Sequence, residues 1–282
     1  MKPIYFLLIL LFSSSCVEQK DAPQISEVKS PSKSEIRRVI DSNFQKIIDD
    51  ANVNGVLLIY DPQNRTYTSN DFDRAEKRFS PASTYKIPNS IIALETGVVK
   101  DENTFFKWDG EKRHFRMWER DFIFSEAYKK SCLPCYQEIA RDIGVNRMKK
   151  FVKKIGYPNM HIDSSNIDQF WLTGDSKISA IEQVQFLERL YNSELPISER
   201  TEKIMKKIMV IEEKFDYQLS GKTGWMVDGD ENLGWFVGFV KQKGKVYFMA
   251  TNIDPKDNFD MKLFPRIRLQ LLKRALKLKG IS

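Results

Sequence analysis

The sequence of 282 residues predicts an α/β (α+β) fold, in which an antiparallel sheet takes strands from both ends of the chain and a block of helices lies between them. Three apolar stretches near the C-terminus, at 219–227, 234–241 and 245–253, are separated by turn residues, as in an antiparallel meander. The apolar run 55–61 ends in Asp-Pro and indicates a further strand near the N-terminus. Between about residues 83 and 214, apolar positions recur mainly at helical spacing.

The 3.6-residue period of the apolar side chains places the helices. It predicts a first helix over residues 35–52. Ser80-Pro81 is then typical of an N-cap followed by proline at the first helical position, and Pro88 makes us expect one tight turn before an apolar helix over residues 89–94. Later helices are predicted at 136–143, 145–155 and 180–190, and a basic amphipathic helix at 263–279.

The first residues predict export. Met1-Lys2 is a short positive region, and residues 4–12 form an apolar stretch too short to span a bilayer. Three serines then precede Cys16, so that residues 1–15 resemble a bacterial lipoprotein signal with cleavage before Cys16 and lipidation of its thiol. Ordinary signal cleavage nearby is the alternative. We expect export to the bacterial periplasm in both cases, with membrane anchoring in the first.

The composition supports a single domain after a short tether. Residues 16–35 contain prolines, serines and charges without an apolar period, which is typical of a flexible segment. With 41% hydrophobic and 12% aromatic residues in the chain, residues 36–282 can form the core of one catalytic domain. The net charge is +7, but the basic residues are scattered and their few clusters predict solvated helix faces. We therefore expect no nucleic-acid partner.

Cys132 and Cys135 form a C-x-x-C pair. The βαβ context of a thioredoxin-like motif is missing, and the two histidines offer no second ligand pair for zinc. An exported protein can form a disulfide, but adjacent helical turns often prevent good disulfide geometry. We therefore expect buried free thiols, with a disulfide as the alternative.

Ser83-Thr84-Tyr85-Lys86 is the motif most informative about chemistry. A serine three residues before a lysine puts the hydroxyl and the amine on the same side of a helical turn. A serine needs a neighbouring base to become a nucleophile, and His114 and His161 have no obvious orienting carboxylate. A lysine kept uncharged fits that role, and the free N–H groups of a first helical turn favour a developing oxyanion. Acyl transfer through a serine ester is the leading hypothesis.

Further motifs follow in a characteristic order. They are Phe79-Ser80-Pro81-Ala82-Ser83-Thr84-Tyr85-Lys86, Ser131-Cys132-Leu133-Pro134-Cys135-Tyr136-Gln137-Glu138, Tyr157-Pro158-Asn159, Phe170-Trp171-Leu172, Glu182-Gln183 and Gly221-Lys222-Thr223-Gly224. S-x-x-K together with K-T-G is typical of serine β-lactamases and penicillin-binding proteins. The whole set resembles the class D (oxacillinase-type) β-lactamases over about residues 52–282. The resemblance implies the β-lactamase/transpeptidase-like fold, with the active site in the crevice between its two parts.

The resemblance implies a role for each matching residue near the nucleophile. Ser83 matches the serine that opens the β-lactam ring and carries the acyl group. Lys86 matches the lysine that takes up carbon dioxide and becomes a carbamate general base, which requires a neutral amine and hence an apolar pocket. Trp171 matches the tryptophan whose indole N–H hydrogen-bonds this carbamate. Ser131 matches a serine that relays a proton.

Other matches concern the substrate and the oxyanion. Lys222, Thr223 and Gly224 match the strand residues that face the substrate carboxylate, with Lys222 as a catalytic point charge. The backbone N–H groups of Ser83 and Trp225 match the oxyanion hole. The resemblance implies no metal and no cofactor except carbon dioxide or bicarbonate for Lys86.

Some positions are open or depart from the family pattern. The arginine that binds the substrate carboxylate is Arg268 by position, with Arg266 as the alternative. Trp118 lies between Ser83 and Ser131 in the sequence and is expected to line the cleft. Leu133 stands where the family usually has valine, and Pro158 stands where it has glycine, which fixes φ and removes a donor.

The resemblance predicts a hydrolase that confers β-lactam resistance, and two alternatives share part of the motif set. A penicillin-binding protein or D,D-peptidase has the same serine, lysine and K-T-G but deacylates slowly. A non-enzymatic β-lactam sensor keeps the acyl group, but it needs membrane-spanning segments, and no apolar run of that length follows residue 16. The motifs around Ser131 and Trp171 favour the class D hydrolase. The range of β-lactams, carbapenems included, and the oligomeric state do not follow from the sequence.

Overall fold

Seven strands form one mixed sheet in the computed structural model of this chain, which describes Met1 and residues 36–281. The strand order is β1-β3-β2-β9-β8-β7-β6, in which β1 and β3 are parallel and the other neighbours are antiparallel. The N-terminal strands thus join the C-terminal meander through β2 and β9, which confirms the predicted fold class. The strands are β1 (Arg37–Ile40), β2 (Val53–Asp61), β3 (Thr66–Ser69), β6 (Val210–Lys214), β7 (Tyr217–Asp228), β8 (Glu231–Gln242) and β9 (Lys245–Pro255), while β4 (Phe105–Phe106) and β5 (Phe122–Ile123) form a separate pair.

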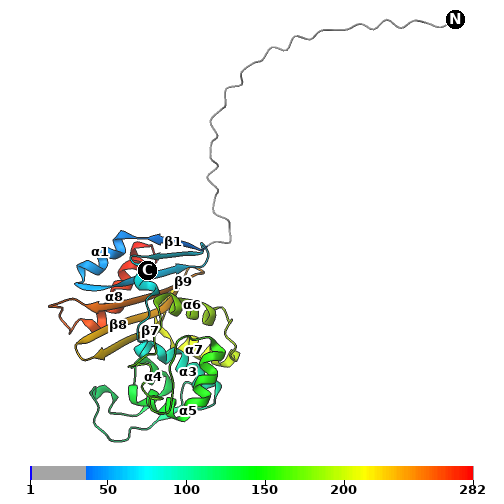
Figure 1. The fold of residues 1–282 in the computed structure, drawn as a ribbon. Coiled ribbons are helices and arrows are strands. Elements are labelled where there is room, and N and C mark those ends of the chain that lie inside the picture. Colours follow the sequence, from blue (N-terminus) through cyan, green and yellow to red (C-terminus); the bar gives the residue numbers. More distant parts are fainter. Residues whose placement is uncertain (2–35, 282) are drawn as a thin grey trace. The chain divides into compact units, whose positions relative to one another are not determined.

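Helices cover both faces of the large sheet (Figure 1). Successive residues of a strand point to opposite faces, so Leu57 and Ile59 of β2 join one core while Val56 and Leu58 join the other. The first core is closed by α1 and α8, and the second, larger core by the helices between them in sequence. The helices are α1 (Ser42–Asp50), α2 (Phe72–Glu76), α3 (Lys86–Glu95), α4 (Phe124–Lys129), α5 (Leu133–Ile155), α6 (Ala180–Tyr191), α7 (Glu199–Ile208) and α8 (Phe264–Leu278), with short 3-10 helices at Ala82–Tyr85 and Arg116–Trp118.

The predicted first helix over residues 35–52 is partly wrong. Its first part is strand β1, which pairs with β3. Helix α1 begins only at Ser42, and Asp41 is its N-cap, whose carboxylate accepts a hydrogen bond from the Asn43 N–H at 3.0 Å. The helical period of these residues does not reveal the strand, because β1 forms only by pairing with β3, which lies further along the sequence. The predominantly helical region also ends earlier than predicted, since β6 forms the edge of the sheet.

The other predicted helices are present with modified ends. The two helices predicted at 136–143 and 145–155 are confirmed: α5 consists of two helical stretches separated by the non-helical Gly144 at φ 73° and ψ 159°, and the first stretch begins earlier than predicted, at Leu133. The predicted helix at 180–190 is α6, which begins with a capping box between Ser179 and Glu182. The predicted C-terminal helix is α8.

The signal at 1–15 and the tether at 16–35, with Cys16, lie outside the described residues, Met1 apart. Residues Ile36–Ser282 form one compact unit. Within the described part of the chain, no helix combines the length and the apolar character needed to cross a membrane.

Candidate active site

The turn that carries Ser83 is tightly wound. Residues Ala82–Tyr85 form a 3-10 helix, and α3 continues directly from Lys86. The predicted tight turn is therefore present as the 3-10 helix, but α3 begins three residues before the predicted start and includes Pro88 in its first turn. Ala82, next to Ser83, has φ 47°, a left-handed conformation that non-glycine residues keep only where the surroundings enforce it.

Ser80 does not cap this turn, contrary to the prediction. Its hydroxyl donates to the carbonyl oxygens of Trp171 at 3.0 Å and Leu172 at 3.2 Å. Its own carbonyl accepts a hydrogen bond from Nε1 of Trp235 at 2.9 Å. Ser80 thereby joins the turn of Ser83 to the loop that carries Trp171 and to strand β8.

Lys86 points into an apolar interior toward Ser83. Its Nζ donates to Ser83 Oγ at 3.2 Å and lies 4.8 Å from the ring centroid of Tyr136. Only 1% of the residue is exposed, whereas Ser83 is half-buried. Burial lowers the pKa of Lys86 from 10.5 to about 7, because the charged form loses its hydration. A neutral amine is thus accessible near pH 7 beside a serine hydroxyl.

Trp171 provides a buried donor that has no acceptor. The residue is completely buried, its ring stacks on Tyr85 with the centroids 5.7 Å apart, and its Nε1 has no hydrogen-bond partner among the described residues. A buried N–H without an acceptor is costly and rare in folded proteins. The indole therefore fits an acceptor group that is added to this part of the site.

Ser131 occupies the C-terminal corner of helix α4. Its N–H donates to the Tyr128 carbonyl at 3.1 Å, and the N–H of Cys132 donates to the Ala127 carbonyl at 2.9 Å. These two bonds define a Schellman motif with Ser131 at the left-handed position, where its φ is 51°. Glycine is the usual residue at such a position. A serine here is explained by its hydroxyl, which accepts a hydrogen bond from Nζ of Lys222.

Strand β7 lies directly against the turn of Ser83. A Cβ built on Gly224 would come within 3.1 Å of the Pro81 carbonyl oxygen and of Thr84 Cγ2, so a side chain here would force the serine turn to shift slightly. Lys222 is 4% exposed and donates to Ser131 and, at 3.1 Å, to the Thr223 carbonyl. Thr223 and Trp225 on the same strand are half-buried. The K-T-G strand thus packs against the serine turn and is hydrogen-bonded to Ser131.

Three basic side chains, those of Lys86, Lys222 and Arg268, are buried in this part of the molecule. Burial lowers the pKa of Lys222 well below its usual value, and the charges of Lys86 and Arg268 lower it further. Burial also lowers the pKa of Arg268 to about 10. None of the three forms an ion pair among the residues that the structure describes. Because buried charges normally have counter-charges, the site is built to receive anions.

Arg268, and not Arg266, faces the K-T-G strand. Its Nη1 donates to the Gly224 carbonyl, its Nη2 donates to the Pro265 carbonyl at 2.8 Å, and its guanidinium carbon lies 6.0 Å from the Trp225 ring centroid. Arg266 is exposed on the same helix. The geometry therefore favours Arg268 of the two arginines that the sequence left open.

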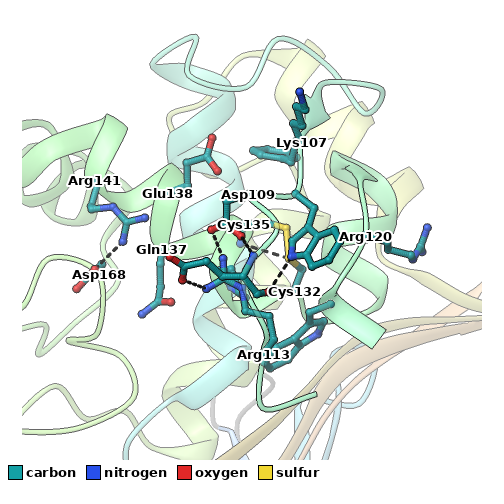
Figure 2. A pocket seen from close by; sticks show the side chains of 15 residues that line it. Lys107, Asp109, Arg113, Arg120, Cys132, Cys135, Gln137, Glu138, Arg141 and Asp168 are labelled. Carbon is teal, nitrogen blue, oxygen red and sulfur yellow. Dashed lines mark hydrogen bonds and ion pairs between the residues drawn. A yellow bond between two sulfur atoms is a disulfide. The ribbon is translucent and has the colours of Figure 1, made fainter. Parts of the chain in front are cut away.

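Trp118 lines a separate hollow of about 340 Å³ beside the Ser131 corner (Figure 2). Its Nε1 donates to the Lys130 carbonyl at 3.2 Å, and its ring meets the edge of Phe115 with centroids 4.9 Å apart. Cys132 and Cys135 border the same hollow. Trp118 thus contacts Lys130, the residue before Ser131, from the side of this separate hollow.

A polar network that the sequence does not predict lies beneath Ser83. Gln183 donates to Thr84 Oγ1 at 2.7 Å, and that hydroxyl donates to the Pro81 carbonyl at 2.6 Å. The Tyr157 hydroxyl donates to the Gln183 side-chain oxygen at 3.2 Å. Glu182-Gln183 belonged to the recognised motifs, but a glutamine on a helix gives no sign of a partner almost a hundred positions earlier.

Cys132 and Cys135 form a disulfide, which corrects the prediction of free thiols. The concern about adjacent helical turns does not apply, because Cys132 is the N-cap of α5 and has a non-helical backbone at ψ 103°. The Cα atoms are 5.5 Å apart, within the range that disulfides require. Of the two departures from the family pattern, Leu133 packs against the larger core and Pro158 lies half-buried between Tyr157 and Asn159.

Three comparisons with known proteins bear on this site. The family model described as the penicillin binding protein transpeptidase domain matches residues 48–272. Beta-lactamase OXA-10 of Pseudomonas aeruginosa is 44% identical over 205 residues, 72% of this chain and 77% of the relative, and OXA-48 of Klebsiella pneumoniae is 42% identical over 78% and 83%. The crystal structure of a class D beta-lactamase from Sebaldella termitidis superposes with a TM-score of 0.82 at 38% identity, covering 88% of this chain and all of that one.

The left-handed backbone of Ser131 gives a stability prediction. Ser131→Gly should raise the free energy of unfolding by about 1 kcal/mol relative to Ser131→Ala, because both lose the hydroxyl but only glycine adopts φ 51° without a steric cost. Urea denaturation of the two variants measures the difference. Equal stability of the two variants would show that the corner places no demand on this residue.

Proposed function

Since the chain belongs to the class D β-lactamases, serine hydrolases that open the β-lactam ring and confer resistance to penicillins and related antibiotics, we propose that Ser83 is its nucleophile and Lys86 its general base. The single observation that supports this assignment is the pair itself: the hydroxyl of a half-buried serine lies 3.2 Å from a buried amine whose pKa is lowered to about 7. Such an amine can accept the hydroxyl proton, which a normal ammonium cannot.

The residues around Lys86 also fit carbon dioxide, the one additional group that the family uses. The amine is neutral in part near pH 7, Trp171 Nε1 lacks an acceptor, and the local positive charge has no anion. When bound to Lys86, carbon dioxide supplies a carboxylate-like general base. Trp171 would donate to it, and the surrounding apolar side chains would keep bulk water away.

On the substrate side, Lys222, Thr223 and Arg268 would bind the carboxylate of the β-lactam. The proposal is supported by the two buried cations and by the contact between Arg268 and the Gly224 carbonyl. Ser131, hydrogen-bonded to Lys222, would pass a proton to the ring nitrogen as the amide bond breaks. The N–H groups of Ser83 and Trp225 would stabilise the oxyanion, which the close packing of Gly224 on the serine turn supports.

Kinetics of single substitutions test the roles of Ser83 and Lys86. Ser83→Ala should abolish acylation, and Lys86→Ala should lower acylation by about 10²–10⁴-fold and nearly eliminate deacylation, since both steps lose the general base. Hydrolysis of a chromogenic cephalosporin and of oxacillin, with and without bicarbonate, measures both. Lys149→Ala, an exposed lysine on α5, is the matched control and should hydrolyse at the unchanged rate. A fully active Lys86→Ala protein would contradict the mechanism.

The lowered pKa of Lys86 predicts a pH-dependent uptake of carbon dioxide. Between pH 8 and pH 6 the neutral fraction of an amine with a pKa of about 7 falls about tenfold, so uptake should fall with it. Carbon-13 NMR of the protein in labelled bicarbonate detects the carbamate carbon directly. Trp171→Phe, which removes the indole N–H but keeps an aromatic ring over Tyr85, should weaken the signal at each pH. A signal that persists in Lys86→Ala would assign it to another amine.

Export and lipidation of the chain belong to the same proposal. The support is the apolar run that precedes Cys16 and the polar composition of residues 16–35. Mass spectrometry of the protein from bacterial membranes should find a mature chain beginning at a diacylated Cys16. A mature terminus without Cys16, or with an unmodified thiol, would leave an exported protein without a lipid anchor.

A further inference from the structure

The segment from Ser131 to Tyr136 contacts both lysines of the site. Ser131 accepts a hydrogen bond from Nζ of Lys222, and the ring of Tyr136 lies beneath Nζ of Lys86. The Tyr136 hydroxyl is also 2.7 Å from Ser90 Oγ, which fixes the start of α5 to α3. The conformation of the residues from Ser131 to Tyr136 therefore determines whether both contacts can form at the same time.

The disulfide spans the residues between the two contacts. Cys132 is the N-cap of α5 and Cys135 lies in its first turn, where the Cys135 N–H also donates to Cys132 Sγ at 3.3 Å. The bond closes a very short loop, so it constrains the unfolded chain less than a disulfide across a long loop does. Its effect is greatest on the local conformation of the corner.

That corner needs support, because Ser131 has the left-handed backbone that disfavours every residue with a Cβ. On the α4 side the support consists of the two Schellman hydrogen bonds and of the Tyr128 hydroxyl, which donates to the Gly221 carbonyl at 3.4 Å. On the α5 side the covalent element is the disulfide. Displacement of a reacting group by about 1 Å can lower a rate a hundredfold, so a small relaxation here has a measurable effect.

We propose that Cys132 and Cys135 are positioning residues: their disulfide holds the α4–α5 corner so that Ser131 Oγ stays in contact with Lys222 Nζ. This inference rests on the proposed function, in which Ser131 relays a proton during acylation. Reduction of the bond by a dithiol gives two cysteine thiols and the cyclic disulfide of the reagent, with two electrons and two protons transferred to the protein. Both cysteines border the hollow of Figure 2 but are only 1% and 6% exposed, so complete reduction by the dithiol is verified by thiol titration before acylation is measured.

A double-mutant cycle tests the proposal on the full enzyme. The acylation rate constant is measured by intact-mass detection of the penicilloyl-enzyme for the parent, C132A/C135A, Ser131→Ala and the triple variant. We expect loss of the disulfide to lower acylation about tenfold when Ser131 is present and to have no further effect in Ser131→Ala, with the dissociation constant of the penicillin unchanged. Equal losses in both backgrounds, or no loss, would overturn the proposal.

Reduction of the intact protein provides a second measurement that does not depend on the folding of a variant. Dithiothreitol should lower acylation of the parent to the level of C132A/C135A and leave C132A/C135A itself unaffected. A general destabilisation would instead lower acylation equally in the Ser131→Ala background, which would contradict a role through Ser131. Complete absence of a penicilloyl-enzyme in the parent would refute the proposed function itself, whereas equal acylation with and without the disulfide would refute only this inference.

Discussion

The burial of Lys86 without a counter-charge is the constraint on which the site depends. An ammonium in this position would lose its hydration and gain only one hydrogen bond to Ser83 and the face of Tyr136 in return. The folded protein therefore gives up a proton that the unfolded chain keeps between pH 7 and 10.5. Across this window Lys86 alone contributes a rise in the free energy of unfolding of about 1.4 kcal/mol per pH unit, because the unfolded state binds one more proton at this residue. Stability is thus lower below the folded pKa, and the gain is a reactive amine near neutral pH.

The same logic extends to the whole cleft. Lys222 and Arg268 come from a strand and a helix near the C-terminal end of the sequence, yet both are buried, and Lys222 lies close enough to Lys86 and to Arg268 for their charges to lower its pKa. Burying these basic side chains lowers the stability of the folded protein until an anion binds beside them. The same burial therefore explains both the lower stability and the affinity for an anionic substrate. The left-handed backbones of Ala82 and Ser131 are also linked to the site. Ala82 precedes Ser83, which contacts Lys86, and Ser131 itself contacts Lys222.

The sequence predicted most of the fold because its strands are long and apolar and its helices are strongly periodic. It predicted the pairing of Ser83 with Lys86 because a helical turn brings positions three apart together. It failed where a distant partner decides the local structure. Strand β1 forms because it pairs with β3. The Ser80 hydroxyl does not cap the turn because it donates to a carbonyl of the Trp171 loop. The Cys132–Cys135 disulfide is possible because the backbone of Cys132, the N-cap of α5, is not helical. The choice between Arg266 and Arg268 likewise required the contact with Gly224.

The antiparallel pairing of β2 with β9 joins the two ends of the catalytic domain, with Val53 opposite Pro255. The nucleophile turn lies early in the chain, whereas Lys222 and Arg268 follow near its end. During synthesis the reactive serine is therefore made long before its binding partners, and contacts of this sequence separation are slow to form. The cleft cannot assemble around Ser83 until the final helix has packed on the sheet. A chain that ends before α8 retains the complete S-x-x-K motif but not the arginine that faces the K-T-G strand.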